Sequence, residues 1–237
     1  MRPLLRSFYM FVRQIFEDTM LAAVCAATLL AAVFIRFGIP AVENALCGYL
    51  GQDAILAHYY LFFDLLLAVV TPYMLCFASA MMMLTEYDEN MTGYLAVTPV
   101  GKKGYILSRL VFPAILAFIV SLMLMHWFSL TKWALGMIVS VCLATSLMSI
   151  AVALFLFAFS HNRVEGMAMG KLSGLLLMGL PVPFFLTSNM QYWFSPLPSF
   201  WVAKLSMEQN AVFLLPALLS SLMWIWLLYK KFIRKMR

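Results

Sequence analysis

Long apolar runs, separated by short polar segments, make up most of this chain. Each run is close to the roughly 20 residues that a helix needs to cross a bilayer, and few positions alternate as barrel strands do. The pattern predicts an all-α membrane protein with six transmembrane helices. The predicted spans are Thr19–Ile39, Tyr59–Leu84, Tyr105–Leu130, Trp133–Phe159, Met167–Leu186 and Ala211–Tyr229.

The first 18 residues follow a different pattern. Apolar side chains recur at helical spacing with charged ones opposite, which is typical of a helix that lies on a membrane surface. The apolar face holds Leu4, Leu5, Phe8, Phe11, Val12, Ile15 and Phe16, and the charged face holds Arg2, Arg6, Arg13 and Glu17. We therefore expect an N-terminal amphipathic interfacial helix over residues 1–18 rather than a cleavable signal.

The segment before the last span is irregular. Pro181 and Pro183 remove backbone donors near the outer end of the fifth predicted span. Residues 187–210 are too apolar for a solvated loop, so they predict a re-entrant segment in the outer leaflet. The single transmembrane domain, residues 1–237, then divides into 1–18, spans at 19–84, a loop at 85–104, spans at 105–186, the re-entrant segment, and a last span with a basic tail at 211–237.

Composition and charge support this class and set the orientation. Hydrophobic residues make up 65% of the chain and charged ones 11%, whereas soluble domains carry about 25% charged residues. All Lys and Arg except Arg36, Lys132 and Lys204 fall on one side of the predicted spans. The positive-inside rule then places both termini and the 85–104 loop in the cytoplasm of an inner-membrane protein. The net charge of +6 thus indicates lipid contact and no nucleic-acid partner.

No local motif predicts catalysis, metal binding or nucleotide binding. EGMAMGKLS (165–173) resembles a phosphate-binding loop, but its glycines are too close together and Leu172 replaces the required hydroxyl residue. The same segment has small residues at four-residue steps, a pattern typical of close helix packing. The expected packing residues are Gly166, Gly170 and Gly174, and we expect no catalytic, metal or cofactor-binding residue in this chain.

Three ionisable side chains lie a few residues inside the outer ends of the first three predicted spans, where charge is costly. These are Arg36, Asp64 and His126. We expect Asp64 to pair with Arg36 or His126, because each charge would offset the desolvation of the other. Such a pair is either structural or a polar contact on a substrate path.

The densest polar block, EYDENMTGYLAVTPVGKKGY (86–105), separates the second and third spans. Its acids continue the second span past the membrane surface, and MTGYLAV forms a short helix that ends before Pro99. A polar bend with an apolar knob is suited to docking into a groove on a cytoplasmic partner. An ordinary charged loop is the alternative.

This block and the order of the segments around it resemble ABC-2-type ABC transporter permeases. Glu86, Glu89, Gly93, Leu95, Pro99 and Tyr105 match the family's first cytoplasmic loop. The resemblance implies a half-transporter that pairs with a second permease chain, as a homo- or heterodimer, and with ABC ATPase subunits that bind ATP and Mg. It implies a coupling helix in the loop, with ATPase contacts at Glu86, Asp88, Glu89, Gly93, Tyr94, Leu95, Pro99 and Lys102. It also implies a cavity lined by Thr71, Tyr73 and Ser79.

The expected function is the membrane-spanning permease subunit of an exporter for an amphipathic or hydrophobic drug, peptide or lipid. Two other classes stay open from the sequence. One is an intramembrane enzyme that uses Asp64, His126 or Glu86. The other is a non-transporting membrane immunity or scaffold protein, which would tolerate changes in the 86–105 block.

Overall fold

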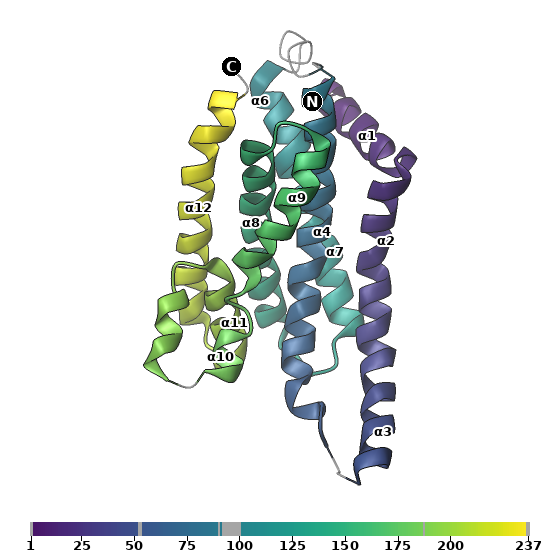
Figure 1. The fold of residues 1–237 in the computed structure, drawn as a ribbon, viewed down its shortest axis with the longest axis vertical. Helices are drawn as coiled ribbons and strands as arrows, with labels where there is room; N and C mark the ends of the chain where they lie inside the picture. The colour runs from purple at the N-terminus through teal and green to yellow at the C-terminus, as the bar shows by residue number, and fades with distance from the viewer. Residues whose placement is uncertain (1, 52–53, 90, 92–100, 187, 236–237) are drawn as a thin grey trace.

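A computed structural model describes residues 2–51, 54–89, 91, 101–186 and 188–235, and every regular element in these residues is helical. The helices are α1 Arg2–Glu17, α2 Thr19–Val33, α3 Ile39–Leu50, α4 Tyr60–Asp88, α6 Gly101–Ile106, α7 Phe112–Phe128, α8 Leu135–Phe159, α9 Arg163–Ser173, α10 Val182–Phe185, α11 Pro198–Glu208 and α12 Leu214–Lys235. The all-α prediction is confirmed for this part of the chain (Figure 1).

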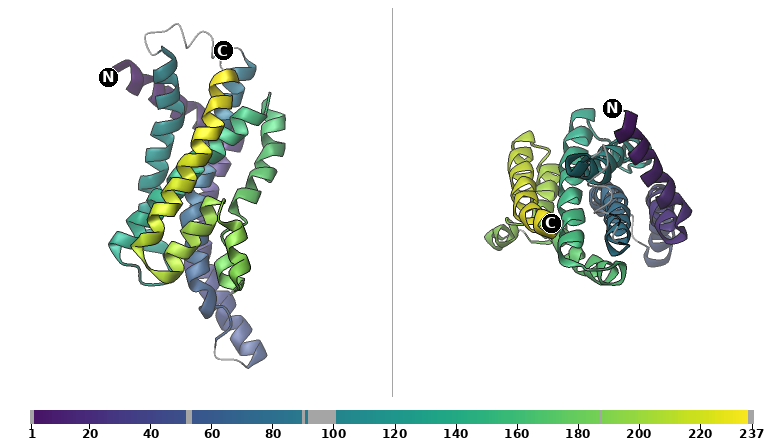
Figure 2. Two further views of the ribbon diagram at one scale, coloured as in Figure 1. Left: turned by 90° about the vertical axis from the view of Figure 1, so that its left-hand side faces the viewer. Right: turned by 90° about the horizontal axis from the view of Figure 1, so that it is seen from above.

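Five helical stretches are long and apolar enough to cross a membrane. They are Thr19–Leu50, Ala57–Asp88, Gly104–Phe128, Leu135–Phe159 and Ala211–Lys235, and they overlap five of the six predicted spans. Seen along the bundle, α4 and α8 lie between α2 at one edge and α12 at the other (Figure 2). Both described ends of the chain lie at the end of the bundle where α4 finishes and α6 begins (Figure 1).

The first long helix continues past its predicted end at Ile39. It begins at Asp18, whose Oδ1 accepts hydrogen bonds from the amides of Met20 and Leu21 at 3.0 and 3.1 Å. Pro40 does not stop it, because a π-helical turn at Phe34–Gly38 joins α2 to α3. The helix ends only at Gly51, which adopts the left-handed conformation (φ 64°) that glycine tolerates best.

Two other prolines sit inside long helices, and a neighbouring serine compensates for each. A proline leaves the carbonyl four residues earlier without its amide donor. Pro72 leaves the Ala68 carbonyl without its amide donor, and this oxygen accepts a hydrogen bond from the Ser121 hydroxyl at 3.4 Å. Pro113 leaves the Arg109 carbonyl without its amide donor, and this oxygen accepts a hydrogen bond from the Ser79 hydroxyl. Serine on a neighbouring helix is a known way to keep proline in apolar surroundings.

The fifth predicted span, Met167–Leu186, is not one continuous helix. α9 ends at Ser173, a 3-10 turn covers Gly174–Leu177, and α10 is a four-residue helix after Pro181. The interruption follows from two glycines and two prolines within ten residues. A crossing of the membrane by this broken segment therefore stays a prediction.

The segment before α12 folds back on the bundle. A 3-10 helix at Asn189–Phe194 leads into α11, which packs against α8 and α12 (Figure 1). Lys204 of α11 is 6% exposed, and its ammonium contacts the hydroxyl and the ring face of Tyr192. These contacts satisfy a cation that would be costly to bury alone. Placement of the segment in the outer leaflet stays a prediction.

The GxxxG-like face of α9 lies against α4. A Cβ added at Gly166 would lie 2.5 Å from Cδ1 of Leu84, and one at Gly170 would lie 2.7 Å from Cε2 of Phe77. Within the described residues, a Cβ at Gly174 would meet nothing within 4 Å. Two of the three predicted packing glycines therefore stand at a close helix approach, and the third does not.

Candidate functional site

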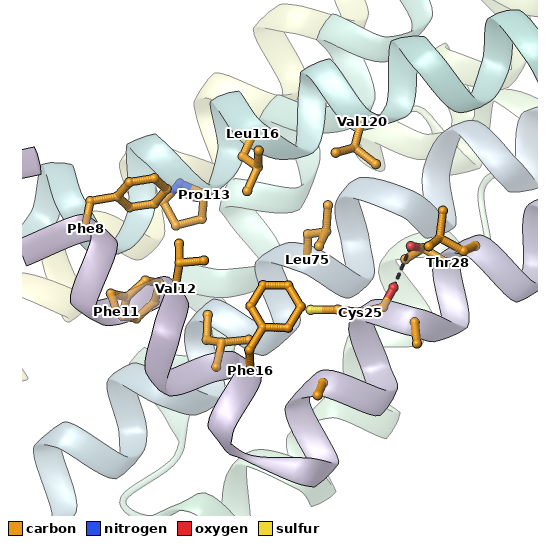
Figure 3. A pocket seen from close by; sticks show the side chains of 14 residues that line it. Phe8, Phe11, Val12, Phe16, Cys25, Thr28, Leu75, Pro113, Leu116 and Val120 are labelled. Carbon is orange, nitrogen blue, oxygen red and sulfur yellow. Dashed lines mark hydrogen bonds between the residues drawn. The ribbon is translucent and has the colours of Figure 1, made fainter.

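A cavity lies between α1, α2, α4 and α7. Its volume is about 540 Å³, within the roughly 300–1,000 Å³ typical of small-molecule sites. Figure 3 shows Phe8, Phe11, Val12 and Phe16 of α1 facing Leu75 of α4 and Leu116 and Val120 of α7, with Cys25 and Thr28 on α2. The remaining lining residues are Ile15, Ala22, Ala26, Leu29 and Pro113. We call this space the α1–α7 cavity.

A buried arginine holds α1 against the bundle at the edge of this cavity. Arg109 lies in a π-helical turn, Leu107–Val111, that precedes α7, and it is 4% exposed. Its Nε and Nη2 donate to the Glu86 carboxylate, the shortest contact being 2.6 Å. Its Nη1 donates to the backbone oxygen and the hydroxyl of Ser7 at 2.9 and 3.0 Å. Three elements, α1, α4 and the start of α7, therefore meet at one guanidinium.

Aromatic rings and a hydroxyl complete the surroundings of Arg109. The guanidinium carbon lies 4.6 Å from the ring centroid of Phe11 and 5.7 Å from that of Tyr105. The backbone oxygen of Arg109 accepts a hydrogen bond from the Ser79 hydroxyl, as described above. We define the Arg109 cluster as Arg109, Glu86, Ser7, Phe11 and Ser79. A planar guanidinium suits such a site, because it binds a carboxylate with two nitrogens while stacking on rings.

The Arg109 cluster changes the interpretation of Glu86. The sequence prediction placed Glu86 at a contact with an ATPase, but its side chain is 3% exposed and faces Arg109. Glu86 therefore presents no exposed carboxylate to a partner. The sequence analysis missed this pair, because it counted Arg109 among the cationic residues of the loops. The signal in the sequence was an acidic residue, Glu86, at the end of the second predicted span and a basic residue, Arg109, near the start of the third.

The other predicted coupling residues are described only in part. Asp88 and Glu89 are exposed at the end of α4. The backbone of Lys102 belongs to α6. Gly93, Tyr94, Leu95 and Pro99 lie outside the described residues. Their role in binding an ATPase stays a prediction.

The predicted pairing of Asp64 with Arg36 or His126 is wrong. Asp64 is fully buried and accepts hydrogen bonds from four donors in the turn between α7 and α8. These are the amides of Leu130 (2.7 Å) and Thr131 (2.9 Å), the Thr131 hydroxyl (2.5 Å) and the indole of Trp133 (3.0 Å). Amides aimed at a carboxylate satisfy its charge without a cation.

Arg36 and His126 lie elsewhere at that end of the bundle. Arg36 is exposed, and its Nη1 donates to the Ser129 oxygen at 2.7 Å. Arg36 therefore binds the turn that also binds Asp64, but not Asp64 itself. His126 is exposed on α7. Both Arg36 and Asp64 thus anchor the α7–α8 turn.

The three residues expected to line a cavity do not line the α1–α7 cavity. The Thr71 hydroxyl donates to the Leu67 oxygen of its own helix at 2.9 Å. The Tyr73 hydroxyl bonds Ser173 at 2.8 Å and the Gly170 oxygen at 3.1 Å, which joins α4 to α9. Ser79 belongs to the Arg109 cluster. All three are buried between helices of one chain.

The residues weighed for an intramembrane enzyme are not brought together. Asp64 and Glu86 are 22 positions apart on α4, or about 33 Å at 1.5 Å per residue. Both carboxylates are fully engaged by other groups. Among the described residues, no three His, Cys, Asp or Glu side chains are grouped as a metal site.

A partly buried ion pair links the start of α2 to the start of α9. Arg163 Nη1 lies 2.5 Å from Asp18 Oδ2. The hydrogen bond from Arg163 lowers the pKa of Asp18, with further help from the amides at the start of α2. The two turns are therefore joined by an ion pair whose strength depends on pH.

We expect this link to weaken in acid. The pKa of Asp18 is lower in the folded chain than in the unfolded one, about 3.9. Its contribution to stability is therefore complete above about pH 5 and is lost as pH falls through the folded pKa. The thermal midpoint of the detergent-solubilised chain should fall more between pH 5 and 3 than that of Asp18→Asn. Asn at the exposed Asp88 is the control and should leave the profile unchanged; equal profiles for wild type and Asp18→Asn would contradict the prediction.

Comparison with known proteins gives one family. A family model described as "Fluoroquinolones export permease protein Rv2686c-like" matches residues 11–229. Two curated relatives, the fluoroquinolones export permease proteins MT2760 and Rv2686c of Mycobacterium tuberculosis strains CDC 1551 and H37Rv, are each 27% identical over 128 residues. The match covers 53% of this chain and 51% of each relative, so it spans about half the length of the curated relatives. No solved structure gives a significant match.

Proposed function

We propose a function from one premise: this chain belongs to the Rv2686c-like family of fluoroquinolones export permeases. On that premise it is the membrane permease subunit of an ABC exporter of the ABC-2 type. The observation that carries the proposal is the family match over residues 11–229, which includes the five long apolar helices almost completely. The substrate is an amphipathic or hydrophobic molecule, with fluoroquinolones as the first candidates because of the relatives' names.

In this proposal the chain works with two kinds of partner. A second permease chain forms the other half of the path, and separate ABC ATPase subunits bind ATP and Mg. The ATPase contacts the 89–104 loop at the cytoplasmic end, where Asp88 and Glu89 are exposed. The proposal is supported by the end of α4 and the start of α6, which lie at the same end of the bundle as both described chain ends (Figure 1).

The Arg109 cluster gives this loop a mechanical connection. The chain enters the loop from α4, which holds Glu86, and leaves it through α6 toward Arg109. A displacement of the loop relative to α4 therefore acts on the buried ion pair and, through Ser7, on α1. Buried pairs tolerate little separation because each charge is left unsatisfied without the other. We propose that closure of the ATPase moves α1 by this route.

The partner contact can be tested at the acidic end of α4. Reversing two exposed charges with Asp88→Lys and Glu89→Lys should lower the amount of co-expressed ABC ATPase that copurifies at least fivefold. Efflux of a fluorescent fluoroquinolone from cells should fall in parallel. Gln209→Lys, at an exposed position at the other end of the bundle, is the control and should change neither. Full copurification and full efflux in the double variant would refute the docking site.

A further inference from the structure

The lining of the α1–α7 cavity favours apolar occupants over polar ones. Its walls are aromatic and aliphatic, and no charged side chain that the structure describes lines it. Among these lining residues, the only polar side-chain atoms are the Cys25 thiol and the Thr28 hydroxyl, and that hydroxyl already donates to the Cys25 oxygen at 2.7 Å (Figure 3). A charged group inside would lose its hydration without compensation. The occupant must therefore present hydrocarbon to this space.

The cavity extends along the membrane-crossing helices. Its lining runs from Ala22 to Leu29 on α2 and from Pro113 to Val120 on α7. Each stretch is about 10 Å long at 1.5 Å per residue. Side chains of α1 form another wall (Figure 3). A space of this length admits a segment of hydrocarbon chain beside the spans.

The cavity opens sideways at apolar residues. Phe16 and Leu29, both in its lining, are 64% and 56% exposed. In a membrane such residues face lipid tails, so hydrocarbon reaches the cavity without passing through water. With α1 at the membrane surface, the exposed Arg6 of its charged face lies at headgroup depth. Arg6 has no acidic partner among the described residues.

We propose that the α1–α7 cavity binds one acyl chain of a phospholipid, and that Arg6 favours an anionic headgroup on that lipid. A cation near the headgroups attracts anionic lipid, by about 1 kcal/mol for each Lys or Arg. The site lies between the first three spans and α1, on one chain, and it needs neither the second permease chain nor an ATPase. The proposal rests on the proposed function only for the depth of α1.

The native chain carries a reporter for this site. Cys25 lines the cavity, whereas Cys47 lies near the end of α3, outside it. Adding phosphatidylglycerol to the delipidated, detergent-solubilised full chain should slow alkylation of Cys25 by a hydrophobic maleimide at least fivefold. Alkylation of Cys47 should not change. Mass spectrometry of the two peptides measures both rates, and no protection of Cys25 would overturn the proposal.

Two alanines on α2 provide a matched pair of variants. Ala26 lines the cavity, and the exposed Ala23 does not. Ala26→Phe should fill the space and weaken retention of phosphatidylglycerol in native mass spectrometry at least tenfold. Ala23→Phe adds the same ring to the outer surface and should retain one lipid like the wild type. Equal retention in both variants would refute the site, and the alkylation experiment stands even if Ala26→Phe fails to fold.

The headgroup and the identity of the occupant are tested separately. Arg6→Gln should reduce the preference for phosphatidylglycerol over phosphatidylcholine about fivefold and leave Cys25 protection by either lipid in place; an unchanged preference would overturn the role of Arg6.

Protection of Cys25 by a fluoroquinolone but not by phospholipid would show that the occupant is a drug and not a lipid. Protection of Cys25 that rises with protein concentration, and not with lipid concentration, would show that the occupant is a second copy of this chain. Lipid binding without any efflux would contradict only the proposed function.

Discussion

Replacing Arg109 with Ala should lower the free energy of unfolding by about 3–5 kcal/mol, because it leaves the Glu86 carboxylate buried without its partner. The loss also removes both hydrogen bonds to Ser7, so α1 should detach from the bundle. The thermal midpoint of the detergent-solubilised chain and protease cleavage after α1 measure the two effects. A shift no larger than that of an exposed substitution would contradict the importance of the cluster.

A double variant separates stability from transport at this cluster. Replacing both charges, as Arg109→Met with Glu86→Leu, should recover most of the lost stability, since well-packed apolar side chains often substitute for a buried ion pair at little cost. It cannot restore the contact with Ser7. Under the proposed function, we therefore expect a folded chain that supports ATP hydrolysis by the proposed ATPase subunits but no fluoroquinolone efflux. Full efflux in the double variant would show that the pair is only structural.

Removing the Asp64 carboxylate should have the second large effect. Asp64→Ala leaves four donors of the α7–α8 turn without their acceptor, and the expected loss is at least about 3 kcal/mol of unfolding free energy. The indole of Trp133 then becomes free to move, so its fluorescence should shift to longer wavelength. Thr71→Val is the matched control on the same helix, because the Thr71 hydroxyl bonds only the carbonyl of Leu67.

The same site distinguishes two accounts of the intramembrane charges. An exchange of charges, Asp64→Arg with Arg36→Asp, would restore stability if the two residues formed an ion pair. The structure leads us to expect no restoration, because Arg36 donates to the Ser129 oxygen and Asp64 accepts from the turn. A stable, active double variant would overturn this assignment.

The sequence was sufficient for the features that depend on apolar length. The start of α2 at Thr19 and the end of α8 at Phe159 agree with the predicted spans. The extension of the first helix to Leu50 was missed, because Pro40 reads as a stop. The stop fails because the π-helical turn Phe34–Gly38 loosens the backbone just before the proline.

The polar contacts were less predictable. Asp64 was singled out as a costly intramembrane charge and Glu86 as an ATPase contact, but the partners of both were not found. The partners of Asp64 are backbone amides and a hydroxyl of a turn 66 residues away, and a turn gives no pattern that marks it as a ligand. Arg109 resembles any basic residue at a membrane boundary until the fold brings Ser7 and Glu86 beside it. Tertiary geometry, not local pattern, decides these pairs.

The two π-helical turns share a consequence for chain length. In each, an arginine precedes a proline by four residues, as Arg36 does Pro40 and Arg109 does Pro113. A π turn holds one residue more than an α turn. Deleting a single residue between Arg109 and Pro113 would make the helix regular but rotate everything before the deletion by about 100°, carrying the guanidinium away from Glu86. Relatives that keep this arginine should therefore carry neither an insertion nor a gap between Leu107 and Pro113.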